Sequence, residues 1–171
     1  MSSALGAMGL VAHELEAWMA NTIDALDVDA APHDIARVED AEQLEDWLRA
    51  FIGGWSIDRP ELQRIVRAAM GPWPGPNAWR RYVAYVDGEP AGEALLTLFG
   101  EAAYLAEAST VPRFRRRGIQ RALIAHRLAE ARAVGATTVF SAVRYGDRSW
   151  SNMRAMGLRE AFLSLSFKRS A

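Results

Sequence analysis

Cysteine is absent from the sequence, and this absence narrows the chemistry that the protein can perform. None of the 171 residues is a cysteine, so disulfide bonds, cysteine-ligated zinc and a cysteinyl acyl-enzyme are all excluded. A domain without disulfides fits a reducing compartment better than a secreted scaffold. Any catalysis must therefore use other side chains or the backbone.

Long apolar runs are also missing. No stretch of the chain approaches the roughly 20 apolar residues that a membrane-spanning helix needs. The N-terminal stretch lacks both the positive start and the unbroken apolar centre of a signal peptide. The length of 171 residues, of which 50% are apolar, suits one compact domain. We therefore expect a soluble, cytoplasmic protein that binds no membrane.

The formal net charge is only -1, but the two halves of the chain differ in sign. Met1–Met70 holds 13 acidic and 5 basic residues, whereas Gly71–Ala171 holds 8 acidic and 15 basic residues. A protein that binds duplex nucleic acid normally has a basic excess, so this function is disfavoured. We therefore expect two ligands of opposite charge. The two N-terminal helices are expected to carry most of the acid excess, and the cationic ligand is expected to bind near them.

Hydrophobic periodicity divides the chain into strands and helices. Their order predicts an α/β (α+β) fold, in which a mixed, mostly antiparallel sheet of about six to seven strands is flanked by helices. The expected elements are a helix-like piece at 10–19, strands at 34–40, 137–143 and 161–169, three antiparallel strands within 79–110, helices at 41–55, 59–70, 119–134 and 147–156, and a rigid proline-rich loop at 71–77.

A basic loop joins one expected strand to the strongest expected helix. The stretch from Thr110 to Gln120 reads TVPRFRRRGIQ. Pro112 holds Val111 extended, and Gly118 leaves backbone N–H groups at the helix N-terminus open to a ligand. The arginines add charge-assisted hydrogen bonds to an anion. The pattern therefore predicts a pyrophosphate site, and a solvated basic turn is the alternative.

This stretch resembles the central motif of the GNAT superfamily of acyl-CoA N-acyltransferases, V-x-P-x-x-R/Q-x-x-G-x-G/A. It departs from the motif at Thr110, where valine is usual, and at Gln120, where Gly or Ala is commonest. The resemblance implies that the anion is the pyrophosphate of coenzyme A. A second stretch, SWSNMRAMGL, is similar to the family segment S-x-x-N-x-x-x-x-G-F, whose Asn helps to hold the pantetheine arm. An Asn with an ordinary turn or helix-cap contact is the alternative.

The resemblance covers Asp34–Arg169 and implies a set of cofactor-binding residues. We expect residues 33–171 to form the GNAT acyltransferase domain. Residues 1–32 are expected to form an N-terminal arm. An alternative is that this arm is the remnant of a preceding half, as found in longer, tandem members of the family. The expected cofactor-binding residues are Ser109, Thr110, Val111, Arg115, Arg116, Arg117, Gly118, Ile119, Gln120, Arg121, Ser149 and Asn152.

The resemblance also implies where the acyl group is transferred. In the family, the thioester lies where the fourth strand of the domain separates from the fifth, and a backbone N–H polarises its carbonyl group; here this N–H is that of Ala108. Glu107 is the expected base, with a solvated surface glutamate as the alternative. A tyrosine often protonates the leaving thiolate, but Met153 occupies that position and Tyr145 is a substitute.

Together these inferences favour an acetyl-CoA-dependent N-acetyltransferase that moves an acetyl group directly to a primary amine in a ternary complex. A covalent carrier is not expected, because cysteine is absent and no serine-histidine-acid arrangement is evident. The alternatives are a non-catalytic acyl-CoA-binding module, which Met153 favours, and a nucleic-acid binder. The expected partners are acetyl-CoA and an amine acceptor, with no metal, nucleic acid or membrane, and a homodimer is left open.

Overall fold

The computed structural model describes residues 6–26, 33–71 and 79–170. The strands are β1 (Leu10–Thr22), β2 (Asp34–Arg37), β3 (Trp79–Val86), β4 (Glu89–Phe99), β5 (Ala102–Thr110), β6 (Thr138–Arg144) and β7 (Arg159–Arg169), and the α-helices are α2 (Ala41–Gly54), α3 (Pro60–Met70), α4 (Ile119–Ala133) and α5 (Arg148–Ala155).

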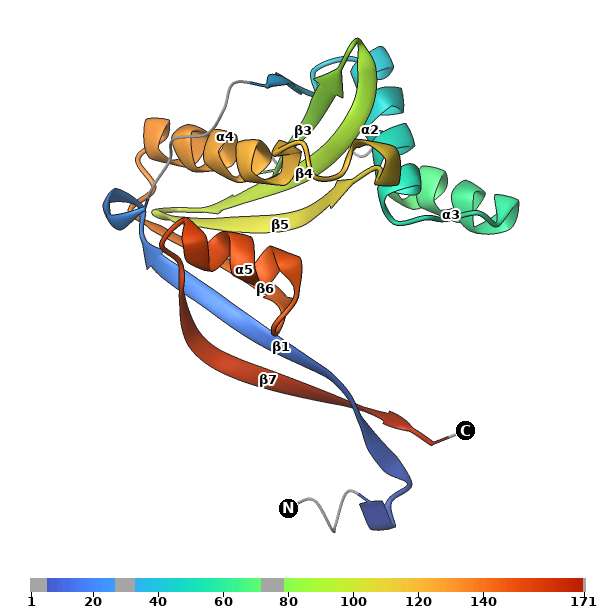
Figure 1. Ribbon diagram of the computed structural model, residues 1–171, viewed down its shortest axis with the longest axis vertical. Helices are drawn as coiled ribbons and strands as arrows, with labels where there is room; N and C mark the ends of the chain where they lie inside the picture. The colour runs from blue at the N-terminus through green and yellow to red at the C-terminus, as the bar shows by residue number, and fades with distance from the viewer. Residues whose placement is uncertain (1–5, 27–32, 72–78, 171) are drawn as a thin grey trace.

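All the strands belong to one seven-stranded sheet (Figure 1). Their order is β2-β3-β4-β5-β6-β1-β7, and of the neighbouring pairs only β5 and β6 run parallel. The mixed, mostly antiparallel sheet that the sequence predicts is therefore confirmed. The proline-rich loop expected at 71–77 lies outside the described residues, apart from Gly71.

The N-terminal strand is the main departure from expectation. The helix predicted over 10–19 is wrong, because this segment is part of β1, which lies between β6 and β7 and is antiparallel to both. Ala17 and Met19 are buried, whereas Glu16 and Trp18 alternate with them and are only half-buried. Figure 1 shows β1 and β7 leaving the body of the molecule as a two-stranded arm. That residues 1–32 are the remnant of a preceding half stays a prediction.

The helices cover opposite faces of the sheet. On β3, the ring of Tyr82 lies edge-on to His126 of α4, with ring centroids 4.9 Å apart. The next residue, Val83, packs in a cluster with Trp47 of α2. Since neighbouring side chains on a strand point to opposite faces, α4 and α2 lie on opposite sides. In Figure 1, α4 and α5 are in front of the sheet.

A close approach between α4 and β4 fixes the position of the basic loop. A Cβ atom on Gly92 of β4 would lie 2.8 Å from Cγ2 of Ile119, the first residue of α4. No other residue type leaves this space free, so the start of α4 rests directly on the sheet. Gly118, which precedes the helix, is held beside the end of β5 by the same packing.

Arg127 is fully buried in α4 and joins this helix to the sheet. Its Nη1 donates hydrogen bonds to the carbonyl oxygens of Leu95 on β4 at 2.9 Å and of Ala106 on β5 at 2.8 Å. Burial lowers the pKa of Arg127 to about 10, so the group is still charged at neutral pH. The β4–β5 register shifts next to Leu95, and Arg127 supplies hydrogen bonds to the backbone at this irregularity.

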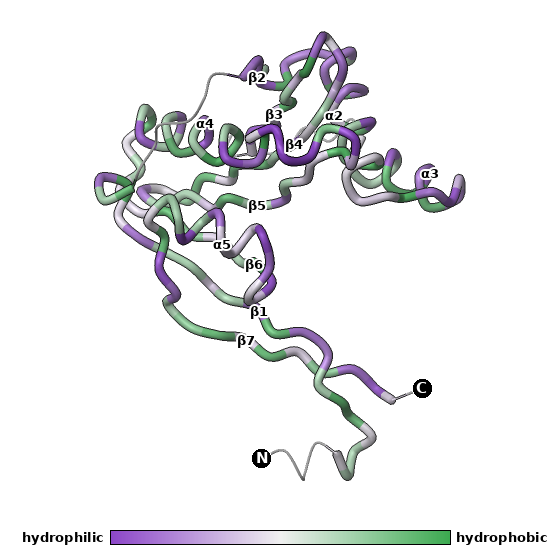
Figure 2. Tube along the Cα trace, viewed as in Figure 1, coloured by the Kyte–Doolittle hydropathy of each residue, from purple (hydrophilic) through white to green (hydrophobic). Residues whose placement is uncertain are grey.

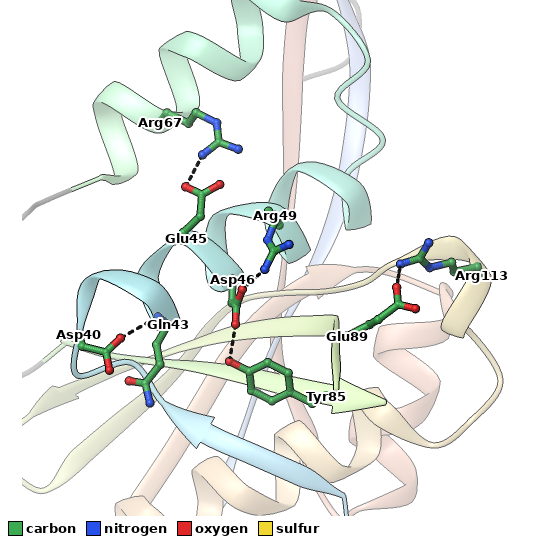
Figure 3. A network of polar contacts seen from close by, with 9 residues as sticks. All are labelled: Asp40, Gln43, Glu45, Asp46, Arg49, Arg67, Tyr85, Glu89 and Arg113. Carbon is green, nitrogen blue, oxygen red and sulfur yellow. Dashed lines mark hydrogen bonds and ion pairs between the residues drawn. The ribbon is translucent and has the colours of Figure 1, made fainter. Parts of the chain in front are cut away.

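Polar contacts attach α2 to β3 and to α3 (Figure 3). The hydroxyl group of Tyr85 donates to Asp46 of α2 at 2.9 Å, and Arg67 of α3 pairs with Glu45 at 2.6 Å. Asp46 also pairs with Arg49. The expectation that these two helices carry most of the acid excess is wrong, because together they hold four acidic and three basic residues.

Replacing Arg127 tests its role in the sheet. Arg127→Met should lower the free energy of unfolding by about 3 kcal/mol, because two buried carbonyl oxygens lose a charged donor. Urea unfolding followed by circular dichroism measures this change. Arg64→Met, at an exposed position on α3, is the control and should change stability by less than about 0.5 kcal/mol. Equal losses in both variants would contradict the assigned role.

Candidate active site

The sheet opens between its two parallel strands. Pairing of β5 with β6 covers only Ala102–Tyr104 and Thr138–Phe140, and it stops there. The hydroxyl group of Ser141 donates to the carbonyl oxygen of Leu105 at 2.7 Å, immediately beyond the last pair. The C-terminal halves of β5 and β6 then have no mutual backbone pairing. The separation of strands that the family resemblance implies is therefore present.

Glu107 lies at an irregularity on the edge of this opening. Ala94 of β4 pairs with Ala108, and Leu95 pairs with Ala106, so Glu107 is an extra residue in the β5 ladder. One extra residue on one strand defines a β-bulge, which changes the direction of the side chain. The structure thus places Glu107 and Ala108 beside the opening, although their catalytic roles stay predictions.

The Glu107 side chain lies on the sheet face opposite α4, because it is two residues from Ser109 on β5 and Oγ of Ser109 faces Gly54 of α2. The pKa values of Tyr104 and Glu93 are both raised, mainly by burial and to a smaller extent by the Glu107 carboxylate. Glu93 pairs with Val83, which packs against α2, so this face is the α2 face. Glu107 is exposed, yet nearby protein atoms partly desolvate its carboxyl group and raise its own pKa. A base with a raised pKa accepts a proton more readily than an ordinary glutamate.

Glu93 is an acidic residue of this region that sequence reasoning missed. It is completely buried, and burial raises its pKa to about 8. Neither carboxylate oxygen, nor the hydroxyl group of the paired Ser109, has a hydrogen bond of good geometry among the described residues, although the Ser109 and Trp55 side chains lie close enough to oppose the rise in the pKa of Glu93. A Cβ atom on Gly54 of α2 would lie 1.9 Å from Oγ of Ser109. The Ser109 side chain therefore points toward α2 and Glu93 rather than toward the basic loop. The sequence did contain a signal for this buried carboxylate, because Glu93 is a single glutamate within an otherwise apolar stretch of β4.

The basic loop has the backbone geometry of an anion site. Arg116 and Gly118 both have left-handed backbone conformations, with φ of 65° and 81°. No described residue accepts a hydrogen bond from the backbone N–H groups of Arg116, Arg117 or Gly118. α4 begins at Ile119 without a side-chain cap. Free N–H groups at a helix N-terminus attract anions, so these residues fit a phosphate group.

The arginines of the loop have different contacts. Arg115 donates to the carbonyl oxygens of Thr110 at 3.2 Å and Gly54 at 3.3 Å, and so holds the loop against β5 and α2. Arg113 pairs with Glu89 (Figure 3). The Arg113 and Arg117 guanidinium groups lie over the ring of Phe114, at 4.7 and 5.6 Å from its centroid. Exposed Arg116 has no ion pair among the described residues and is the arginine most available to an anion.

Gln120 joins the start of α4 to α5. Its amide nitrogen donates to the hydroxyl group of Ser149 at 3.0 Å, and its amide oxygen accepts from Nδ2 of Asn152 at 2.6 Å. The glutamine, which is larger than the usual Gly or Ala, is therefore directed toward α5 and away from Gly118. The structure brings together the two stretches that carry the family resemblance, while the binding roles of all three residues stay predictions.

The remaining expected residues are near the site but have local contacts of their own. The N–H of Val111 donates to the carbonyl oxygen of Ala91 at 2.9 Å. Ile119 is buried and Arg121 is exposed on the first turn of α4. Met153 is buried in the core, and Tyr145 is 46% exposed. The thioether of Met153 has no proton to donate to the leaving thiolate. Tyr145 is the tyrosine nearest to it in sequence that could donate one.

Two kinds of site are not found in the described part of the chain. No group of three His, Asp or Glu side chains there could hold a metal ion. None of the helices in 6–26, 33–71 and 79–170 is long and apolar enough to cross a membrane.

This chain has a sheet that opens between two parallel strands and a basic loop at a helix N-terminus, and both features are typical of proteins with a GNAT fold. The family model described as "Acetyltransferase (GNAT) domain" matches residues 20–150, and the chain belongs to this family. No curated protein is significantly similar to it.

Solved structures share the fold at low sequence identity. A GCN5-related N-acetyltransferase from Kribbella flavida is 20% identical, with a TM-score of 0.69 over 98% of this chain and 62% of its own. One from Sphaerobacter thermophilus is 15% identical, with a TM-score of 0.73 over 96% of this chain and 54% of its own. The chain thus spans less than two thirds of the length of these two proteins. AAC(6')-Iy, in complex with a bisubstrate analogue, is 19% identical, with a TM-score of 0.61 over 82% and 99% of the two chains.

The loop geometry gives a prediction for binding. Gly118→Val should weaken acetyl-CoA binding about tenfold or more, because the side chain strains a left-handed backbone and covers N–H groups that would bind phosphate. Calorimetry measures the affinity. Gly135→Val is a matched control, since Gly135 follows α4 with φ of 84° and has open space around it. Unchanged affinity in Gly118→Val, or equal losses in both variants, would reject the loop as the phosphate site.

Proposed function

We propose that the protein is an N-acetyltransferase that moves the acetyl group of acetyl-CoA directly to a cationic primary amine. The observation that carries this proposal is the opening between β5 and β6, with Glu107 on its edge and free backbone N–H groups at the adjacent loop. GNAT enzymes use acetyl-CoA as the acetyl donor, and the chain belongs to this family.

The residues at the opening fit the two ends of this donor. The N–H groups of Arg116–Gly118 and the Arg116 guanidinium would hold the pyrophosphate. Asn152, whose amide nitrogen donates a hydrogen bond to Gln120, would contact the pantetheine arm through its amide oxygen. The thioester would then lie between β5 and β6, where the N–H of Ala108 would donate a hydrogen bond to the carbonyl oxygen as negative charge develops on it.

Glu107 would take the proton that the amine must lose. The ammonium form has no lone pair, so deprotonation precedes attack. The amine nitrogen then bonds to the carbonyl carbon and gives its second proton to water, the carbon–sulfur bond breaks, and the thiolate leaves with the electron pair. A thiol has a pKa near about 8.5, so the thiolate can leave at neutral pH and take a proton from Tyr145 or water. Turnover would therefore be possible although Met153, which is buried at the position of the usual tyrosine, cannot protonate the thiolate.

Several features support the amine acceptor. Exposed Glu107 gives the α2 face a negative charge near the opening, and negative charge concentrates cations. The solved structure of AAC(6')-Iy holds an analogue in which CoA is joined to monomethyl-acetylneamine, so a GNAT fold accommodates an amine and CoA together in that protein. The alternative is an acyl-CoA-binding module without turnover, which the buried Met153 favours.

Glu107→Gln separates these two functions. The change should lower kcat for amine acetylation by about 10²- to 10⁴-fold, and leave the affinity for acetyl-CoA within about twofold. Release of free thiol in the presence of an amine panel measures kcat. Because burial raises the pKa of Glu107, wild-type kcat should fall as pH falls through that pKa, and this acidic limb should be lost in the variant.

Glu101→Gln is the control, because Glu101 is exposed at the turn between β4 and β5. It should retain wild-type kcat and pH profile. Full activity of Glu107→Gln across the pH range would remove Glu107 from the mechanism. A wild-type protein that binds acetyl-CoA but releases no thiol with any amine would instead favour the non-catalytic module.

A further inference from the structure

A row of aromatic rings crosses the sheet from β4 to β7. Consecutive rings are stacked, with centroid distances of 6.4, 4.9, 6.4 and 5.5 Å. Five neighbouring strands contribute one ring each. In this order the rings are those of Phe99, Phe140, Tyr104, Trp18 and Phe162.

The aromatic row lies on the α2 face of the sheet, beside the proposed acyl-transfer site. Tyr104 alternates along β5 with Ala103 and Leu105, which are buried in the core that also contains α4. Trp18 alternates in the same way with Met19, so both rings point to the opposite face. Figure 1 shows α2 and α3 beside β3 and β4, away from β1 and β7. Phe162 at the β7 end is 57% exposed.

Carboxylates accompany the rings. Besides burial, both Glu107 and Glu16 contribute to the raised pKa of Tyr104, so both carboxylates lie near that ring. Glu16 is two residues from Trp18 on β1 and therefore on the same face. Arg144, the cross-strand neighbour of Glu16 on β6, pairs with Glu14 at 2.7 Å. An aromatic surface beside acidic groups has the chemistry that attracts a cation.

We propose that this surface selects diamines or polyamines, and that it holds a second ammonium group of the acceptor while the first reacts beside Glu107. This inference rests on the proposed function. The methylene chain would lie along the edges of Tyr104 and Trp18, whose faces are turned to neighbouring rings, and the second ammonium would lie over the exposed outer face of Phe162. Tyr104, Trp18 and Phe162 follow one another at 6.4 and 5.5 Å between ring centroids, so a ligand that contacts all three must be extended.

A purely apolar occupant fits this face less well. A second copy of the chain placed here would desolvate Glu107 and Glu16 without supplying a paired cation, which is costly. The opposite face of the β1–β7 arm is different, because exposed Leu163 and Leu165 lie there and the carboxylate of that face, Glu160, already pairs with Arg154 and accepts a hydrogen bond from Trp150. Figure 2 shows hydrophobic residues along most of β7 between hydrophilic ends. This second face supplies a matched control position.

Two acceptors of equal length test the proposal. Decanediamine and undecylamine differ only in that a terminal ammonium replaces a methyl group, and both are long enough to pass two rings of the row. Wild-type kcat/KM should favour decanediamine, and Phe162→Ala should reduce this preference about fivefold through the loss of a cation–π contact. Trp18→Leu, which removes the ring on which Phe162 stacks, should reduce it as well. Leu163→Ala, 51% exposed on the other face, should leave the preference unchanged, and thermal melting checks that each variant is folded.

Other outcomes overturn the proposal and distinguish it from failure of the proposed function. Equal losses for both amines would mean that the rings bind only the methylene chain. Wild-type dimers that dissociate in Phe162→Ala, seen by sedimentation, would assign the face to a second copy. If no amine is acetylated, the proposed function fails; calorimetry with decanediamine then decides, since equal binding by the wild-type protein and Phe162→Ala rejects the surface.

Discussion

The loss of pairing between β5 and β6 is the constraint on which the rest of the site depends. Two parallel strands that separate leave backbone groups that must find other partners. Ser141 of β6 supplies one donor, to the carbonyl oxygen of Leu105 on β5. On the other side of β5, Arg127 donates to Leu95 and Ala106 at the irregularity in the β4–β5 ladder. These side chains supply donors to carbonyl groups on both sides of β5. The opening in turn exposes the edge of β5 at Glu107.

The start of α4 is placed at the end of this edge by packing rather than by charge. Gly92 lets Ile119 contact the sheet, and Gly118 adopts a left-handed conformation that no β-branched residue tolerates well. Arg115 and Gln120 then fix the loop to its neighbours on either side. Only after these contacts are made do free N–H groups remain for an anion. The arginine cluster is therefore partly structural and only partly a binding surface.

Local sequence signals predicted the elements that depend on local structure. The proline, the glycine and the apolar period identified the loop and α4. β1 was missed because its conformation depends on pairing with β6 and β7, more than a hundred residues away. The aromatic row and the buried Glu93 were missed for the same reason, since sheet order decides which side chains meet. Charge counts over the N-terminal half led us to place the acid excess on α2 and α3, but these helices hold nearly as many basic as acidic residues.

The central claim is that the loop before α4 and the opened edge of β5 form one acyl-CoA site. Amide chemical shifts of the ¹⁵N-labelled protein, followed as coenzyme A is added, test this claim directly. The largest changes should occur at Arg116–Gly118, at Ala108 and along the C-terminal half of β6, and they should saturate together with one dissociation constant. Changes confined to α2, α3 or the β1–β7 arm, with the loop amides unaffected, would contradict the account.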